Sequence, residues 1–134
     1  MEIDVIEYSI VAGNDIQHMI MVVDVENNFI IGTKENNSGS FAIIDVITDC
    51  LSAYDSDYRF SMDMETESHD CECCGYYEDV TVTYVCKKGA MQFYEYGHFG
   101  GGNYDIDGIK KEFANIGIIL NFYCKNESFI LNYK

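Results

Sequence analysis

Carboxylates and tyrosines follow one another closely in the middle of the chain, and they are the residues whose types and spacing best suit a chemical role. Between positions 45 and 79 the sequence holds eleven carboxylates and a single arginine. Carboxylates spaced along a rigid element can imitate the phosphate row of a nucleic acid, and tyrosines on the same surface supply contacts that hold a partner. The pattern gives a set of candidate partner-binding residues: Asp49, Tyr54, Asp55, Asp57, Tyr58, Asp63, Glu65, Glu67, Asp70, Glu72, Tyr76, Tyr77, Glu78 and Asp79.

Charge is unevenly distributed along the chain. Residues 1–86 contain 18 acidic and two basic residues, whereas residues 87–134 contain five acidic and six basic residues. The formal net charge of the whole chain is −15. A field of this size and sign disfavours nucleic acids and anionic membranes as partners, and it attracts basic surfaces. Solubility requires net charge but gives no reason to spare residues 87–134.

A cysteine-rich segment is the second place where residue types suggest chemistry. Cys71 and Cys74 form a Cys-x-x-Cys pair, a spacing at which two thiolates can bind one tetrahedral zinc ion. No second pair of this kind follows, so a surface loop of reduced thiols and a redox pair remain as alternatives. The residues that could form a zinc site are His69, Cys71, Cys73, Cys74 and Cys86, and Cys50 is a further thiol that could complete it.

Residues 97–103 form a glycine-rich loop ahead of a predicted helix, where backbone amides could hold a phosphate. The P-loop lysine and the dinucleotide-binding glycine pattern are both missing, and Asp105 and Asp107 stand where the phosphate would lie. The run from Asn103 also resembles the start of an EF-hand calcium loop, but Ala114 occupies the position of the required glutamate. A surface loop followed by a helix cap is the simpler interpretation.

The chain lacks the residue patterns of known catalytic sites. It has no nucleophile elbow, no His-Glu-x-x-His zinc motif, and no kinase or Walker motif. Its carboxylates are too numerous for any two to be chosen as an acid and a base. We therefore predict that the protein is not an enzyme, and zinc is the one cofactor that its residues suggest.

The spacing of apolar residues predicts strands and two short helices in one domain spanning residues 1–134. Helices are expected at about 41–54 and 105–116, where apolar residues recur every three or four positions, with capping residues at 38–40 and at Asp105 or Asp107. Two helices are too few to cover a parallel sheet, so we predict an α+β domain with a mainly antiparallel sheet. Strands are expected at 2–11, 16–24, 28–33, 58–65, 80–86, 91–99, 118–124 and 129–133.

Local signals add further detail to this prediction. A change of phase at Val5 and Ile6 indicates a β-bulge, and tight turns are expected at 26–28, 87–89 and 125–128. Residues 66–79 are expected to be a polar connection. Strict alternation predicts a half-buried strand over 58–65, with one face made of Tyr58, Phe60, Met62 and Met64.

The start of the sequence does not resemble a secretion signal. Carboxylates at Glu2 and Asp4 stand where such a signal has basic residues, and no apolar run approaches membrane-spanning length. We therefore expect a cytoplasmic protein whose cysteines are thiols or ligands and do not form a disulfide framework.

These observations favour an acidic decoy, or DNA mimic, that binds a basic nucleic-acid-binding protein and occludes its nucleic-acid site. In size, charge and apparent class the chain resembles the inhibitors that phages encode against restriction nucleases and CRISPR effectors, and the acidic immunity proteins paired with bacterial toxins. No motif points to a particular family. Two alternatives remain: a small zinc-stabilised regulatory or adaptor domain built around Cys71 and Cys74, and a small-ligand or nucleotide binder that uses the 97–103 loop.

Overall fold

The computed structural model of the chain describes residues 1–36, 42–73, 75–97 and 100–124. Within these residues it has seven strands in two sheets and two α-helices, which confirms the predicted α+β domain with mainly antiparallel sheets. Sheet A has the strand order β3-β2-β1-β7, with bounds β1 Glu2–Ala12, β2 Asp15–Asp24, β3 Phe29–Glu35 and β7 Ile119–Cys124. Sheet B is an antiparallel meander in the order β4-β5-β6, with bounds β4 Ser61–Cys71, β5 Gly75–Cys86 and β6 Gly89–Tyr96.

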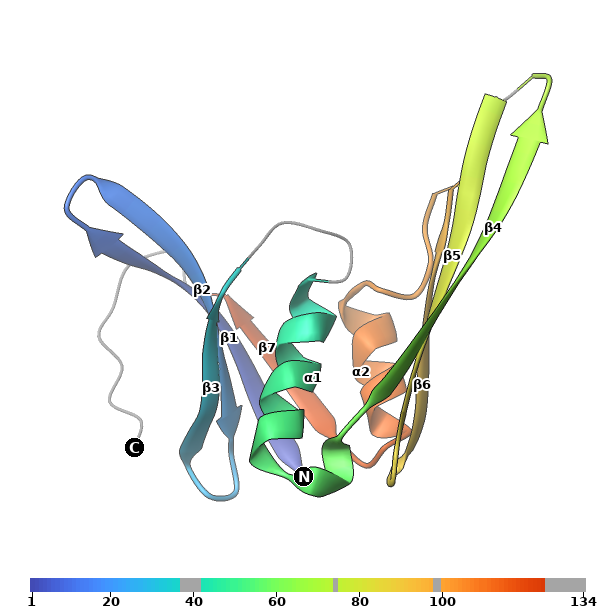
Figure 1. The fold of residues 1–134 in the computed structure, drawn as a ribbon. Helices are drawn as coiled ribbons and strands as arrows, with labels where there is room; N and C mark the ends of the chain where they lie inside the picture. Colours follow the sequence, from blue (N-terminus) through green and yellow to red (C-terminus); the bar gives the residue numbers. More distant parts are fainter. Residues whose placement is uncertain (37–41, 74, 98–99, 125–134) are drawn as a thin grey trace.

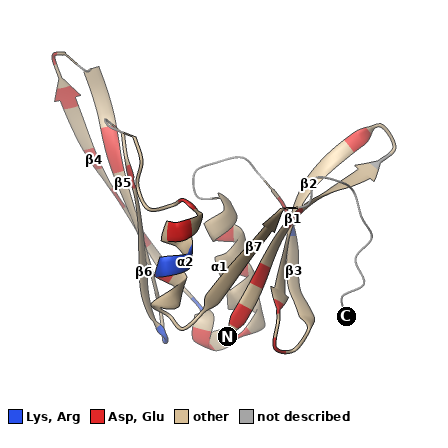
Figure 2. Ribbon diagram, turned by 180° about the vertical axis from the view of Figure 1, so that it is seen from behind, with Lys and Arg blue, Asp and Glu red and all other residues tan. Residues whose placement is uncertain are grey.

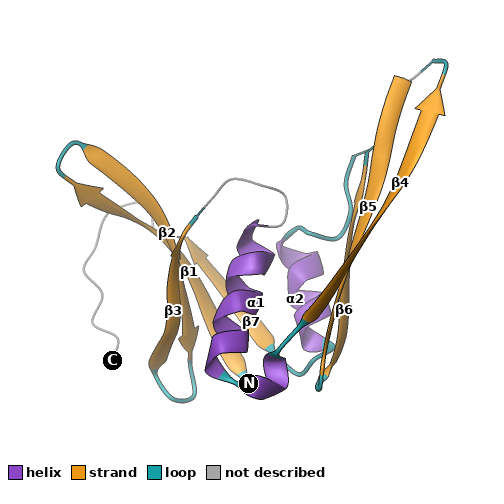
Figure 3. Ribbon diagram, in the orientation of Figure 1, coloured by secondary structure: helices purple, strands orange, loops and turns teal. Residues whose placement is uncertain are grey.

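The two helices lie between the two sheets (Figure 3). They are α1 (Ala42–Tyr54) and α2 (Ile106–Ala114), and the short 3-10 helix η1 (Ser56–Tyr58) follows α1. One apolar core joins all three layers, because the buried side chains of each layer point toward the middle. Its largest fully buried members include Ile3, Ile20, Ile44, Ile47, Leu51, Met91, Phe93, Ile109 and Phe113.

Helix α1 forms where the sequence predicts it, because Ile44, Ile47 and Leu51 recur at helical spacing and are fully buried. Gly32 of β3 lets the helix approach sheet A closely. A Cβ at that position would lie 2.2 Å from the sulfur of Cys50, so a side chain there would push α1 away. The predicted capping residues at 38–40 and the first helical position, 41, lie outside the described residues.

Helix α2 begins and ends as its sequence predicts. The Asp105 side chain caps its first turn by accepting a hydrogen bond from the backbone N–H of Gly108 at 2.9 Å. Gly117 adopts a φ of +80° just after the helix, a conformation that suits glycine and turns the chain into β7. Ile109 and Phe113 form its buried side.

The middle of sheet A is buried on both faces, which corrects the predicted bulge at Val5 and Ile6. The pairing of β1 with β2 is continuous from Ile3 to Ala12. Val5 faces the helices, whereas Ile6 belongs to a second apolar cluster on the other face with Tyr8, Met21 and Val23. Successive apolar residues in a strand buried on both sides mimic a change of phase. The irregularity that the structure does contain lies between Val22 and Val23, where β2 pairs with β3.

Strand β7 pairs with β1 in parallel, and this is the one parallel pairing among the described strands of a fold that is otherwise antiparallel, as predicted. The register runs from Glu2 opposite Ile119 to Glu7 opposite Cys124. Parallel neighbouring strands need a long connection between them. Here the connection from β1 to β7 contains all the other strands and both helices. The predicted partner strand at 129–133 and its turn at 125–128 lie outside the described residues.

The longest departure from the sequence prediction is the hairpin formed by β4 and β5. Residues 66–79, expected to be a polar connection, form most of this hairpin, which pairs without interruption from Ser61 opposite Val85 to Cys71 opposite Gly75. The hairpin projects beyond the helices, so both of its faces meet solvent there (Figure 1). Apolar residues are therefore not required on either face, and the usual strand signal is missing. The predicted half-buried strand at 58–65 is wrong in two ways: Tyr58 ends η1, and Met62 and Met64 are 56% and 55% exposed because the helices do not cover this part of the sheet.

None of the helices in the described residues is both long enough and apolar enough to cross a membrane.

Candidate functional site

The exposed face of sheet B gathers the largest number of candidate residues. Val82 and Phe93 of this sheet point into the core, so the residues that alternate with them point away from the helices. We call this side the outer face. It is formed by Asp63, Glu65, Glu67, His69, Tyr77, Asp79, Thr81, Thr83, Gln92, Tyr94 and Tyr96.

Three carboxylates form a row along β4 on the outer face. Asp63, Glu65 and Glu67 occupy alternate positions, so neighbouring members are about 6.7 Å apart along the strand. All three are exposed, and within the described residues Asp63 and Glu65 form no ion pair. Asp79 of β5 adds a fourth carboxylate, directly opposite Glu67. The row is held in place by an unbroken strand pairing and does not depend on a loop.

Tyrosines lie beside this row on the same face. Tyr94 and Tyr96 of β6 have ring centroids 5.2 Å apart, and Tyr96 is directly opposite Asp79. Tyr77 stacks on His69 at a centroid distance of 4.8 Å. Across the three strands, the outer face therefore changes from carboxylates on β4 to aromatic rings on β6.

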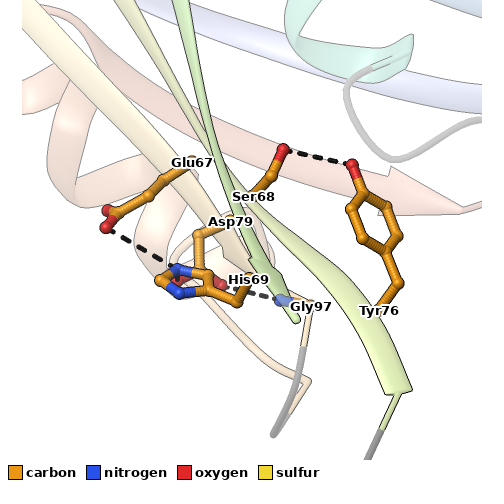
Figure 4. A network of polar contacts seen from close by, with 6 residues as sticks. All are labelled: Glu67, Ser68, His69, Tyr76, Asp79 and Gly97. Atoms are coloured by element: carbon orange, nitrogen blue, oxygen red, sulfur yellow. Dashed lines mark hydrogen bonds and ion pairs between the residues drawn. The ribbon is translucent and has the colours of Figure 1, made fainter. Parts of the chain in front are cut away.

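The opposed carboxylates of Glu67 and Asp79 create a local excess of negative charge. Like charges directly opposite each other destabilise a strand pair. His69 lies next to both groups: its Nε2 is 3.3 Å from an oxygen of Asp79 and 3.8 Å from an oxygen of Glu67 (Figure 4). The second oxygen of Asp79 accepts a hydrogen bond from the backbone N–H of Gly97 at 3.1 Å. These contacts fix Asp79 in place and leave Glu67, whose side chain is 78% exposed, open to a partner.

A hollow of about 390 Å³ lies on the same part of sheet B. It is lined by Glu65, Thr66, Glu67, Asp79 and Thr81, so three of its five lining residues are carboxylates. A planar guanidinium can bind two carboxylate oxygens at once, which makes arginine the side chain best suited to such a hollow.

Other candidates on the same hairpin face the opposite way. Tyr76, Glu78 and Asp70 alternate with the outer-face residues and lie on the side toward the helices. The Tyr76 hydroxyl donates to the Glu78 carboxylate. The Tyr76 hydroxyl oxygen is also 3.1 Å from the hydroxyl oxygen of Ser68 (Figure 4). Glu72 lies in the turn between β4 and β5. One surface therefore cannot present all the acidic residues of the hairpin.

Another group of candidates lies near α1 and η1, away from the outer face. Asp49 is exposed on α1. Asp55 caps η1 by accepting a hydrogen bond from the N–H of Asp57 at 2.9 Å, and Asp57 lies within 3.9 Å of Lys87 and 3.8 Å of Lys88. Acidic positions occur on both sheets, and the basic ones include those on α2 and at the turn from β5 to β6 (Figure 2).

The candidates Tyr54 and Tyr58 have structural contacts. Tyr58 is only 5% exposed, and burial, followed by nearby carboxylates such as Asp55, raises the pKa of its hydroxyl. The Tyr54 hydroxyl donates to Asp24 at 2.8 Å, and its ring stacks on Phe29. Neither side chain is placed to contact a partner at the outer face.

Asp24 is a buried carboxylate that the sequence did not single out. Burial by itself raises the pKa of this group, but hydrogen bonds from Asn27, Tyr54 and the backbone N–H groups of Asn27 and Glu26 outweigh burial. The net pKa of the Asp24 carboxyl is therefore below its ordinary value. The group stays ionised and holds the β2–β3 turn against the end of α1.

The cysteine-rich segment does not assemble a metal site from the residues that the structure describes, among which no group of three or more His, Cys, Asp or Glu side chains could hold an ion. Cys86 lies at the far end of β5, about 36 Å along the strand from Gly75, which pairs with Cys71. The Cys71 and Cys73 sulfur atoms are 3.2 Å apart, and the His69 ring faces Asp79. Cys74 lies outside the described residues.

The described part of the glycine-rich loop, together with Asp105, makes hydrogen bonds that stabilise the fold. Asn103 accepts a hydrogen bond from the backbone N–H of Tyr94 at 2.8 Å and donates one to the carbonyl of Gln92 at 2.9 Å. The Asp105 carboxylate occupies the N-terminus of α2, where a bound phosphate would lie. In the EF-hand-like run, Asn103 therefore bonds to the edge of β6 and Asp105 caps α2. Residues 98–99 of the loop lie outside the described residues.

Tyr94 and Tyr96 are outer-face residues that the sequence analysis missed. The signal was present, because Met91 and Phe93 are the core positions of β6 and the residues that alternate with them must face away. His69 was considered only as a metal ligand, and its place between two carboxylates depends on a cross-strand register that the sequence does not reveal.

Comparison of the chain with protein-family models, with curated proteins and with solved structures finds no match in any of the three.

Proposed function

We propose that the protein binds a basic, nucleic-acid-binding protein through the outer face of sheet B and occludes its nucleic-acid site. The observation behind this proposal is the arrangement of Asp63, Glu65, Glu67 and Asp79 on one exposed face beside Tyr94 and Tyr96. Such a decoy would act in the manner of phage inhibitors of nucleases and CRISPR effectors, or of toxin-immunity proteins. The target is proposed from surface chemistry alone.

The spacing of the carboxylates supports imitation of a nucleic-acid strand. Alternate residues on a strand are about 6.7 Å apart, which is comparable to the separation of successive phosphates along one nucleic-acid strand. Lysines or arginines that bind successive phosphates would therefore meet Asp63, Glu65 and Glu67 in turn. The acid-lined hollow at Glu65, Glu67 and Asp79 gives an arginine of the partner a place to bind.

The tyrosines add aromatic contact area, which charge alone does not provide. Long-range attraction speeds association, whereas aromatic contacts buried on binding slow release. Tyr96 is 49% exposed in the free protein, so much of its ring is available to a partner. A surface that served solubility alone would need the carboxylates but not adjacent aromatic rings.

The opposition of Glu67 and Asp79 is a further argument for function. Stability alone favours opposite charges or neutral residues at directly opposed positions of a strand pair. Local arrangements that cost stability are expected mainly at functional sites. The pair is unfavourable for folding and useful for attracting a cation.

Capture from a lysate of the native host tests the proposal. The bait is the tagged protein, and the matched control is a variant with Asp63→Asn, Glu65→Gln and Glu67→Gln, which keeps the side-chain shapes but removes three charges. We expect the native bait to retain a nucleic-acid-binding protein at about 0.1 M salt and to lose it at about 0.5 M, because screening weakens such contacts. Added DNA or RNA should displace the captured protein. Equal capture by the native bait and the variant would contradict the proposal.

A further inference from the structure

The two edges of sheet B differ in how their backbone groups are paired. At the β6 edge, the backbone N–H of Tyr96 donates to the carbonyl of Gly101, and the carbonyl of Tyr94 accepts from the N–H of Asn103. The N–H of Tyr94 donates to the Asn103 side chain, and the N–H of Gln92 donates to Glu112 at 2.8 Å. Residues 101–103 and the Glu112 carboxylate therefore cover this edge.

These contacts also show, for each residue of the sheet, toward which neighbouring strand its backbone N–H and C=O groups point. In an antiparallel pair, each residue directs both backbone groups toward its partner or both away. Tyr94 and Tyr96 direct theirs away from β5, so their opposite residues on β5, Thr81 and Asp79, direct theirs toward β4. Opposite these on β4 are Glu65 and Glu67, whose backbone groups consequently face β5.

The remaining β4 residues direct their backbone groups to the open edge. They are the residues that alternate with Asp63, Glu65 and Glu67, namely Met62, Met64, Thr66 and Ser68. No strand in the described part of the chain lies beyond β4, and no described backbone group bonds to these four residues. Unpaired backbone groups along a regular strand form a template for one more strand.

The side chains on the two sides of this edge have different chemistry. Met62 and Met64 are 56% and 55% exposed on the side toward the helices, so they offer apolar contact area. Asp63, Glu65 and Glu67 lie on the outer face. A strand placed beside β4 would meet methionines on one face and carboxylates on the other.

The charge pattern opposes pairing with a second copy of the chain. An antiparallel pair of β4 strands centred on Glu65 would place Glu65 opposite its copy and Asp63 opposite Glu67. A parallel, in-register pair would place every carboxylate beside an identical one. Like charges at opposed positions destabilise both arrangements. The open edge is therefore protected against self-association and is complementary to a basic strand.

We propose that the open edge of β4 binds an extended segment of a basic partner protein by strand addition. The segment would alternate basic side chains, which face Asp63, Glu65 and Glu67, with apolar side chains, which face Met62 and Met64. Backbone hydrogen bonds to Met62, Met64, Thr66 and Ser68 would fix its register. The inference rests on the proposed function for its basic partner, and it adds the mode of binding.

Amide hydrogen exchange measured by NMR tests the inference on the full chain. The probe is a synthetic peptide of alternating lysine and valine, about nine residues long to match an ordinary strand. We expect the peptide to slow exchange at the amides of Met62, Met64, Thr66 and Ser68. The amides of Asp63, Glu65 and Glu67 face β5 and should be slow with or without the peptide. Binding of the peptide with unchanged exchange at the four edge amides, or no binding at millimolar peptide, would overturn the inference.

Two matched pairs separate strand addition from simple charge attraction. Thr66→Pro removes one outward N–H, and proline is tolerated on edge strands where that group faces solvent, whereas Thr66→Ala keeps it. We expect the peptide Kd to rise about tenfold or more in Thr66→Pro and less than twofold in Thr66→Ala. A peptide N-methylated at alternate residues tests the same bonds from the other side and leaves the protein unchanged, so the test stands even if Thr66→Pro does not fold. Equal affinity of the N-methylated and parent peptides would overturn strand addition.

The outcomes also distinguish this inference from the proposed function. If the captured partner is displaced by nucleic acid but the edge amides of β4 stay unprotected in its complex, the decoy function stands and strand addition falls. If the peptide protects those amides but no nucleic-acid-binding protein is captured, strand addition stands and the decoy function falls. Protection that appears on raising protein concentration without peptide would show a second copy at the edge and overturn the proposed occupant.

Discussion

Sheets A and B are both built on the same pair of helices, but they are buried to different extents. Sheet A has an apolar cluster on each face, whereas sheet B is apolar only on the face that meets the helices. Polar groups near the middle of sheet A are paired with one another, as when Asn121 donates to both Glu2 and Asp4. On the outer face of sheet B, Asp63 and Glu65 remain exposed to solvent. The comparison indicates that sheet A supports the fold, whereas sheet B leaves one polar face open, and this is the face that we propose for partner binding.

The largest expected contrast is between two neighbouring residues of β6. Phe93 is fully buried between Tyr84 and Phe113, so Phe93→Ala should lower the free energy of unfolding by about 3–5 kcal/mol. Tyr94 lies on the outer face, and Tyr94→Ala should cost far less stability while it weakens partner binding. Urea unfolding of both variants checks the first part. A comparable loss of stability in both would contradict the division of sheet B into a structural and a binding face.

Asp24 should make sheet A sensitive to acid. Its folded-state pKa is below the unfolded value of about 3.9, so its contribution to stability is complete above that value and is lost as the pH falls through the folded-state pKa. Asp24→Asn removes this contribution, and we expect it to lower stability at neutral pH by about 1.5–3 kcal/mol, the range for hydrogen bonds to a charged group.

Urea unfolding of the native protein and of Asp24→Asn at several pH values from 7 to 3 measures this effect. The difference between them should be constant near neutral pH and should shrink in acid. A difference that does not change with pH would show that the ionised carboxylate is not what holds the turn.

Equal changes of charge on the two sheets should affect binding differently. The triple variant Asp63→Asn, Glu65→Gln, Glu67→Gln should bind the captured partner at least about tenfold more weakly, a loss of about 1.4 kcal/mol. Its control is Asp15→Asn, Glu26→Gln, Glu35→Gln, which removes the same charge from exposed positions at the ends of the sheet A strands. We expect only a small change there. Affinities measured by titration at fixed salt that fall equally in both variants would mean that net charge, not position, controls binding.

The smallest expected effect concerns the opposed pair on the hairpin. Glu67→Gln removes the repulsion from Asp79 and should raise stability by about 0.2–1 kcal/mol at low salt. Glu65→Gln is the matched control, because Glu65 lies opposite the neutral Thr81. Thermal unfolding at low and high salt checks both, and the gain should shrink as salt rises. A larger gain in the control would contradict the assigned register.

Much of the fold follows from local patterns in the sequence. The buried stripes of α1 and α2 recur every three or four residues, and the turn at 87–89 joins two strands as its residues predict. The helix cap at Asp105 can also be predicted from the local sequence. In contrast, the parallel pairing of β1 with β7 joins the two ends of the described chain, and no local signal specifies it.

The candidate site was only partly predictable for a related reason. Strand β4 has both faces in solvent beyond Glu65, so residues 66–70 are all polar and their sequence resembles a loop. The carboxylates were found by their number, but the face that each one occupies depends on the register with β5. That register places Glu67 and Asp79 together, turns Tyr76 and Glu78 away, and brings Tyr94 and Tyr96 beside the carboxylate row.

A displacement assay tests the central claim most directly. A labelled oligonucleotide is first bound to the captured partner, and the native protein, the outer-face triple variant and the sheet A triple variant are then added in turn. We predict that the native protein and the sheet A variant release the oligonucleotide, and that the outer-face variant does so only at concentrations at least about tenfold higher. Equal release by all three proteins, or no release by any, would contradict the claim that the outer face of sheet B occludes a nucleic-acid site.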